Sequence, residues 1–292
     1  MSANVSSFFH AATFTWTHVA SDPATGAAAV IDPVLDFDPV SGRLGTDAAQ
    51  AVLDHLQAHG LQLKWILETH AHADHLTAAA WLRAQTGAPV AAGEGIVAVQ
   101  AGIKRRLGLG EELVADGSVF DCLLRDGDTL PLGGLSIEVL ATPGHTADSV
   151  SYRIDEAVFI GDTLFSPTAG SARCDFPGGS ASTLYASVQR LYALPDDTQL
   201  YLCHDYPAAG AEPRSVVPMR EQRAHNIHLV AGTSEADFVA LRERRDATLA
   251  LPRLFWPAVQ VNIRAGELPP EDDEGRRYLK LPLDAAALQA EA

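Results

Sequence analysis

The chain has 292 residues, of which 47% are hydrophobic, and a formal net charge of −16. Its length allows one large domain or two small ones. The acidic charge argues against a nucleic-acid partner or an anionic membrane, because phosphate groups are bound by clustered lysines and arginines. It does not exclude a small anionic substrate held by one or two arginines. No apolar stretch approaches the roughly 18 residues of a membrane span.

The N-terminus has neither a basic region followed by a long apolar region nor the arginine-rich composition of a transit peptide, so we expect a cytoplasmic protein. Three cysteines, Cys122, Cys174 and Cys203, are too few and too scattered for a disulfide framework and fit a reducing compartment. For Cys174 and Cys203 we prefer the interpretation of a small buried hydrophobe over that of a reactive thiol.

Apolar periodicity and turn residues predict both strands and helices. In chain order, strands are expected at 14–20, 27–31, 64–68, 88–92, 135–140, 149–153, 157–160 and 199–203, and helices at 46–59, 76–85, 97–107 and 183–194. Two further helices, at 219–230 and 235–249, precede an irregular tail. Because no linker or repeat is visible, we expect a single domain over residues 1–292, with a core at about 10–210 and a C-terminal helical extension at about 211–292.

The densest polar motif is T-H-A-H-A-D-H at residues 69–75, directly after a predicted buried strand. His70 and His72 are two residues apart, so at a strand end their side chains would point the same way, toward one ion. Asp74 and His75 would lie at the N-terminal edge of the helix expected from Leu76, where the helix dipole favours a carboxylate. A solvated polar loop is the alternative, but such a density of ligands has little structural use. Imidazole with carboxylate therefore indicates a catalytic transition-metal site.

Three further polar residues follow predicted strands. His145 lies after the strand at 135–140, Asp162 after that at 157–160, and His204 after that at 199–203. Each alone would be an ordinary turn or core residue. Layered α/β folds bring strand ends together, so jointly they predict a metal cleft.

These motifs carry a resemblance. The succession T-H-x-H-x-D-H, T-P-G-H-T at 142–146, G-D at 161–162 and H-D-Y at 204–206 is similar to the metallo-β-lactamase superfamily over residues 10–210, approximately. It implies an α+β four-layer αββα sandwich with the metal at one edge of two sheets. I-D-P-V at 31–34 and R-C-D-F at 173–176 look like the persulfide dioxygenase branch, whose longer bacterial members share the C-terminal extension.

The resemblance implies one non-haem Fe(II) per chain, which oxidises glutathione persulfide with O2 to sulfite and glutathione. The implied metal ligands and catalytic residues are His70, His145 and Asp162, a facial triad that leaves positions open for O2 and substrate. The remaining polar residues of the cleft would orient these ligands; they are His72, Asp74, His75 and His204. All seven positions of a two-metal site are present, so a glyoxalase II-like thioester hydrolase stays open. A non-catalytic sulfur- or metal-binding protein is a third hypothesis.

Glutathione has two carboxylates, so its site needs cations and hydrogen-bond donors. The expected substrate-binding residues are Arg173 paired with Asp175, Tyr206, and Asn262 with Arg264 in the tail. For Arg173 a loop salt bridge, for Tyr206 a strand-end contact and for Arg264 a surface position are the alternatives. A homodimer is possible, because acidic enzymes of this size often form one.

Overall fold

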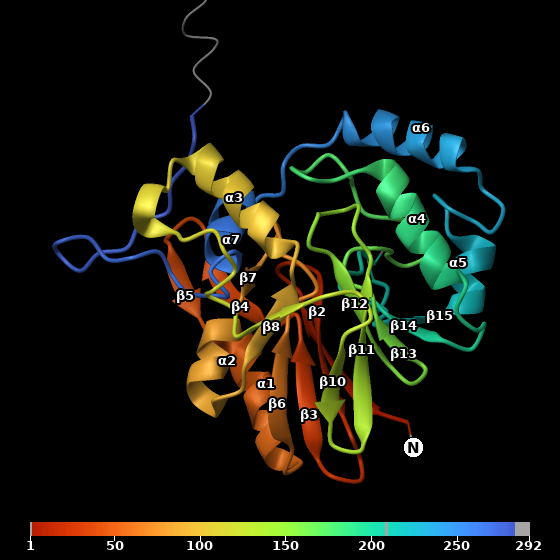
Figure 1. The fold of residues 1–292 in the computed structure, drawn as a ribbon, viewed down its shortest axis with the longest axis horizontal. Helices are drawn as coiled ribbons and strands as arrows, with labels where there is room; N and C mark the ends of the chain where they lie inside the picture. The colour runs from red at the N-terminus through yellow and green to blue at the C-terminus, as the bar shows by residue number, and fades with distance from the viewer. Residues whose placement is uncertain (1, 208–209, 284–292) are drawn as a thin grey trace, which may run out of the picture.

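Two six-stranded sheets face each other in the computed structural model, which describes residues 2–207 and 210–283 (Figure 1). The first sheet has the order β1 (Asn4–His10), β2 (Thr15–Ser21), β3 (Ala27–Ile31), β6 (Gln62–Leu67), β8 (Val90–Gly93) and β9 (Cys122–Leu124). The second has the order β10 (Thr129–Leu132), β11 (Leu135–Ala141), β12 (Val150–Ile154), β13 (Ala157–Phe159), β14 (Gln199–Tyr201) and β15 (Val216–Pro218). A small sheet joins β5 (Arg43–Gly45), β4 (Val34–Asp38) and β7 (Leu76–Thr77).

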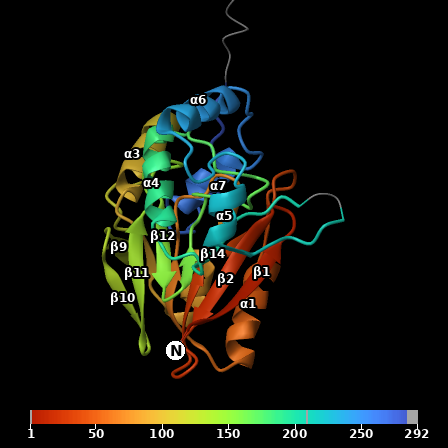
Figure 2. The same cartoon turned by 90° about the vertical axis from the view of Figure 1, so that its right-hand side faces the viewer.

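Helices cover both outer faces. The helices are α1 (Asp47–Ala58), α2 (Ala79–Thr86), α3 (Ile96–Leu107), α4 (Ala181–Tyr192), α5 (Met219–His225), α6 (Glu235–Asp246) and α7 (Phe255–Asn262), with a 3₁₀ turn at Gly110–Glu112. Figure 2 shows α6 at the end of the molecule beyond α4, against which it packs. No helix among the residues that the structure describes is long and apolar enough to cross a membrane.

The layers follow from alternation along the strands. In β3, Ala29 and Ile31 face the second sheet, while Ala28 and Val30 face the helices α1, α2, α3 and α7. Successive side chains of a strand point to opposite faces, so an entirely apolar strand serves two cores at once. A third core lies between the second sheet and the helices α4 and α6. The result is the four-layer αββα arrangement that the resemblance implies.

Two expectations about residues 74–78 are wrong. The helix expected from Leu76 begins at Ala79, because Leu76 and Thr77 pair with β4 as the strand β7. Asp74 and His75 therefore precede a strand, and the helix-dipole position expected for Asp74 does not form.

The tail, expected to be irregular, contains α7. Pro257 is the third residue of this helix, in the first turn, where its missing N–H breaks no intrahelical hydrogen bond. A proline that looks like a helix breaker in the sequence is thus compatible with the helix. The predicted helix at 219–230 is shorter than expected and ends at His225, and β1 was not expected.

Candidate metal centre

The loop after β6 is fixed from two strands that flank it. Asp32, at the end of β3, accepts hydrogen bonds from the Thr69 backbone N–H at 2.8 Å and from the Thr69 hydroxyl at 2.9 Å. Asp148, just before β12, accepts one from the Ala71 N–H at 2.7 Å. Both carboxylates are buried. They hold the backbone that carries the histidines.

A third anchor comes from α7. The Asn262 amide donates to the backbone carbonyls of His72 and His75, both at 2.8 Å, and its oxygen accepts from the Thr77 N–H at 2.9 Å. Because an amide is both donor and acceptor, this one buried side chain clamps the end of the loop at three points.

The structure brings His70, His145 and Asp162 together. Their ligating atoms lie within 4.8 Å of one another, and all three residues are buried. The Nε2 atoms of His70 and His145 are 3.9 and 3.7 Å from the same oxygen of Asp162, Oδ2. The three residues come from the ends of β6, β11 and β13, so strand-end convergence forms the group.

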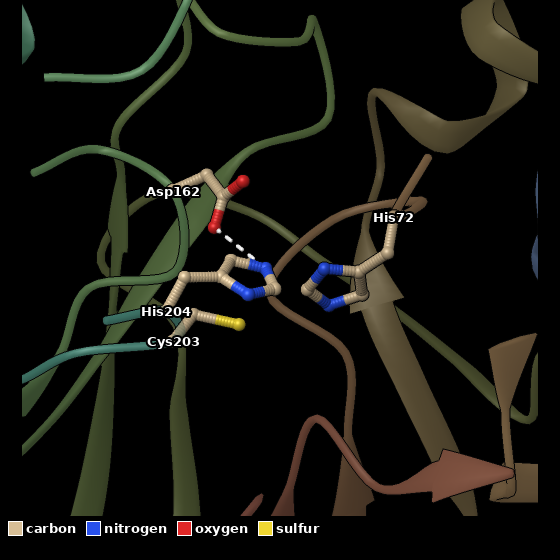
Figure 3. Close-up of side chains that lie close together, drawn as sticks. All are labelled: His72, Asp162, Cys203 and His204. Carbon is tan, nitrogen blue, oxygen red and sulfur yellow. Dashed lines mark ion pairs between the residues drawn. The ribbon is translucent and has the colours of Figure 1, made fainter. Parts of the chain in front are cut away.

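A second group lies on the other side of Asp162. It consists of His72, Asp74, His75 and His204, whose ligating atoms again lie within 4.8 Å of one another. His204 Nε2 is 3.1 Å from Asp74 Oδ2 and 3.3 Å from Asp162 Oδ1. Figure 3 shows the carboxylate of Asp162 above the ring of His204, with the ring of His72 beside it. Asp162 thus faces both groups, one oxygen to each.

The tautomer of His145 leaves one ring nitrogen directed at the centre. His145 Nδ1 donates to the Arg173 carbonyl at 2.7 Å, which leaves Nε2 as the ligating atom. Metal-binding histidines commonly donate their other N–H in this way. His72 Nε2 lies 3.0 Å from Asp32 Oδ1 but forms no hydrogen bond with it.

Five buried polar atoms of these two groups have no hydrogen-bond partner among residues 2–207 and 210–283; they are His72 Nδ1, His72 Nε2, His75 Nε2, Asp162 Oδ1 and His204 Nε2. Buried polar atoms without partners are rare in native proteins. A bound cation would satisfy the carboxylate oxygen and one ring nitrogen of each histidine, so the residues present fit a metal.

The electrostatics agree with that fit. Burial, with the neighbouring imidazoles, holds the pKa of His70 and His72 well below the usual value, so both rings are neutral ligands at pH 7. Burial alone would lower the pKa of His204, but Asp162 and Asp74 outweigh it and raise that pKa. The two carboxylates therefore favour positive charge at the position of His204, as they would favour a bound cation.

A cavity of about 560 Å³ opens beside the centre, within the size range of small-molecule sites. Asp74, His145 and Asp162 line its inner part, and Phe165 and Phe176 are among its apolar walls. A substrate in this cavity would therefore meet the metal-binding residues directly.

Of the expected substrate-binding residues, Arg173 and Tyr206 line this cavity. Arg173 is bound through two nitrogens to both oxygens of Asp175, at 2.6 and 2.7 Å, and donates to the Ala250 carbonyl at 2.7 Å. Tyr206 is half exposed, and its ring stacks 6.1 Å from that of His204. Asp175 does not line the cavity, and its carboxylate holds the guanidinium group of Arg173 in place.

Asn262 and Arg264 do not line the cavity. Asn262 is occupied by the loop that it clamps, and Arg264 is buried, with Nη1 donating to the Gln260 carbonyl at 2.6 Å. Sequence reasoning missed Asp148 and Arg245. The A-D-S after T-P-G-H-T is an ordinary turn sequence that gives no signal for Asp148, whereas the helical spacing of Arg242, Arg245 and Leu249 in the extension could have indicated a common face.

The comparisons with known proteins agree with this geometry. The model of the metallo-beta-lactamase superfamily matches residues 20–204. The chain is 46% identical over 291 residues to a probable metallo-hydrolase of Burkholderia pseudomallei, covering 96% of this chain and 99% of that protein. It is 48% identical to a beta-lactamase hydrolase-like protein of Agrobacterium fabrum, covering 96% of this chain but 65% of the length of that longer protein. Among solved structures, ETHE1 from Myxococcus xanthus matches with a TM-score of 0.73 and 34% identity, over 90% of this chain and all of that one.

Two further relatives carry different chemistries in their names. The mitochondrial persulfide dioxygenase ETHE1 of Homo sapiens is 30% identical, over 88% of this chain and 87% of that protein. A hydroxyacylglutathione hydrolase of Methylococcus capsulatus is 31% identical, over 91% of this chain and 87% of that protein. The chain belongs to the metallo-β-lactamase superfamily, with the fold of that superfamily, and within it to the ETHE1-like branch.

Proposed function

We propose that the protein is a persulfide dioxygenase with one Fe(II) per chain, which oxidises glutathione persulfide with O2 to sulfite and glutathione. The observation that carries the proposal is the group of His70, His145 and Asp162 beside a substrate-sized cavity. Two imidazoles and one carboxylate with open positions are the ligand set of non-haem Fe(II) oxygenases. The similarity to ETHE1 of Myxococcus xanthus and Homo sapiens supports it.

The reaction balances without a further reductant. Glutathione persulfide, O2 and water give glutathione and sulfite with two protons; the terminal sulfur loses four electrons, O2 gains four, and the S–S bond breaks. Iron bound by the triad would supply a place for sulfur and O2 to react next to each other.

The residues of the chain prepare this place. The Arg173 carbonyl keeps the His145 tautomer in the ligating form. Phe165 and Phe176 keep one side of the cavity apolar, which limits water at the reacting sulfur.

The second candidate is a thioester hydrolase with two metal ions. The specific observation in its favour is the second buried group around His204, which shares Asp162 with the first. The similarity to the hydroxyacylglutathione hydrolase supports it as well.

Metal analysis of protein purified without oxygen, combined with an oxygen-electrode assay on glutathione persulfide, separates the two functions. One iron per chain with O2 uptake is expected. Two zinc ions per chain with hydrolysis of a glutathione thioester and no O2 uptake would overturn the proposal, and a metal-bound protein that turns over neither substrate would point to a binding protein.

Two variants sharpen the test. Asp162→Ala should remove both iron and O2 uptake. His75→Ala affects a residue of the second group alone, so the iron content should persist. Under the hydrolase hypothesis the same variant would lose one of two metal ions. The cytoplasmic location and the homodimer stay predictions of the sequence.

A further inference from the structure

The C-terminal extension forms one wall of the cavity beside the metal centre. Six of its residues line the cavity together with Asp74, His145 and Asp162; they are Ile227, Arg242, Arg245, Leu249, Ala250 and Pro252. The extension therefore takes part in whatever the cavity binds.

Three arginines line this cavity, and two of them are neutralised within the protein. Arg173 is paired with Asp175. Arg242 is buried, is paired with Asp246, and donates to the Ser171 carbonyl at 3.1 Å. Arg245 has no ion pair and no side-chain hydrogen bond within the described part of the chain. Its charge is thus the one arginine charge of this lining without an internal partner.

The helix α6 directs Arg245 toward the cavity. Arg242, Arg245 and Asp246 follow the spacing i, i+3, i+4, which places them on one face of α6, and Leu249 follows the end of the helix. Both arginines line the cavity, but Arg242 is buried whereas Arg245 is exposed, so the guanidinium of Arg245 lies on the side of the cavity that is open to solvent.

The helix that carries Arg245 is held in place at both ends. Asp246, its neighbour, accepts a hydrogen bond from the Cys174 N–H at 2.8 Å, in the loop that also carries Arg173. The N-terminus of α6 is capped by Ser234, whose hydroxyl accepts from the Asp237 N–H. A guanidinium on a fastened helix loses less entropy on binding an anion than one on a free loop.

We propose that Arg245 binds a carboxylate of the thiol carrier, so that α6 selects carboxylate-bearing carriers for the metal centre. This inference rests on the proposed function, which supplies the carrier glutathione. In a chain of net charge −16, an anion is repelled from most of the surface, and an unpaired guanidinium in the cavity offsets this repulsion.

The test measures binding of glutathione, and of its diethyl ester with both carboxylates masked, to the iron-loaded protein by anaerobic calorimetry. Arg245→Gln should weaken glutathione binding about tenfold, the effect of one charge-assisted hydrogen bond at a solvent-accessible site, and leave the ester unchanged. Arg244→Gln is the matched control, because Arg244 is exposed on the same helix and does not line the cavity. It should bind both ligands like the wild type.

Each outcome decides. Glutathione binding of Arg245→Gln within twofold of wild type overturns the inference, as does an equal loss for acid and ester, which would show a disturbed cavity. Absence of glutathione binding to the wild type overturns the carrier of the proposed function and this inference with it. If the wild type turns over glutathione persulfide and Arg245→Gln binds glutathione as well as the wild type does, the proposed function stands and only this inference fails.

Discussion

Replacing Asn262 with alanine tests how the extension supports the metal centre. The amide makes three hydrogen bonds to the loop after β6, and its side chain is buried. Asn262→Ala leaves the Thr77 N–H buried without a partner and frees the carbonyls of His72 and His75. An unsatisfied buried donor costs about 1–3 kcal/mol, and the carbonyls add less because they have a second lone pair. We expect a loss of about 3 kcal/mol in the free energy of unfolding.

The metal should respond as well. His72 and His75 would lose the contacts that fix their backbone, and the loop that they share with the proposed ligand His70 would be held less firmly. Disturbing groups that orient metal ligands typically lowers metal affinity about 10- to 100-fold. Competition with a chelator measures that affinity directly, and urea unfolding of the metal-free protein measures the stability separately.

Gln260→Ala provides the control. Gln260 is also a buried amide of α7 with three hydrogen bonds, but these go to Trp256 and Lys280 and not to the loop. It should lower stability to a similar degree and leave metal affinity unchanged. If both variants lose metal affinity equally, or if Asn262→Ala retains it fully, the clamp has no specific effect on the metal and our reasoning fails.

Three further predictions concern other parts of the molecule. Burial lowers the pKa of His18 to about 4, so between pH 6.5 and pH 4 the unfolded chain binds a proton at this residue and the folded chain does not. Over that range the free energy of unfolding, measured in urea, should fall by about 3 kcal/mol more for wild type than for His18→Gln. Equal losses would contradict the assigned pKa. Gly95→Ala should destabilise the protein strongly, because the new Cβ would lie 2.4 Å from the Ala147 carbonyl oxygen. Gly102→Ala is the control: Gly102 lies in α3 with open space around its Cβ position, so alanine there should raise the free energy of unfolding by about 0.5–1 kcal/mol. Burial raises the pKa of all three thiols, and Cys122 is partly exposed whereas Cys174 and Cys203 are buried. Iodoacetamide should therefore label Cys122 slowly in the native protein and the other two cysteines only in urea. Labelling of a second cysteine in the native protein would contradict its burial.

The polar residues at strand ends were the part of the centre that the sequence could predict. Strand ends and ligand chemistry are local properties, so the motif at 69–75 and the separate residues His145, Asp162 and His204 could be assigned to one metal cleft before any fold was known. The choice of His70, His145 and Asp162 as the ligands comes from the resemblance to the family. Each residue was recognised from its immediate neighbours in the chain.

What the sequence could not show depends on tertiary contacts. Leu76 and Thr77 have a helix-compatible pattern, and only pairing with β4 makes them a strand. Asn262 looks like a substrate-binding residue in an Asn-x-Arg segment, and only the position of α7 against the loop gives it a structural role. Arg245 becomes a candidate ligand-binding residue because Arg173 and Arg242 already have partners, which no sequence pattern reveals.

The loop that carries the histidines is anchored from three parts of the chain: Asp32 after β3, Asp148 before β12, and Asn262 in α7. We propose on this basis that core and extension form one cooperative unit, since α7 cannot detach without exposing the apolar contacts that it shares with the first sheet and releasing the loop. Calorimetry should then give a single transition whose van't Hoff enthalpy equals the calorimetric enthalpy. A separate, earlier transition that leaves the core folded, seen as rapid hydrogen exchange confined to α6 and α7, would mean that the extension is an independent unit and that the metal loop is stable without it.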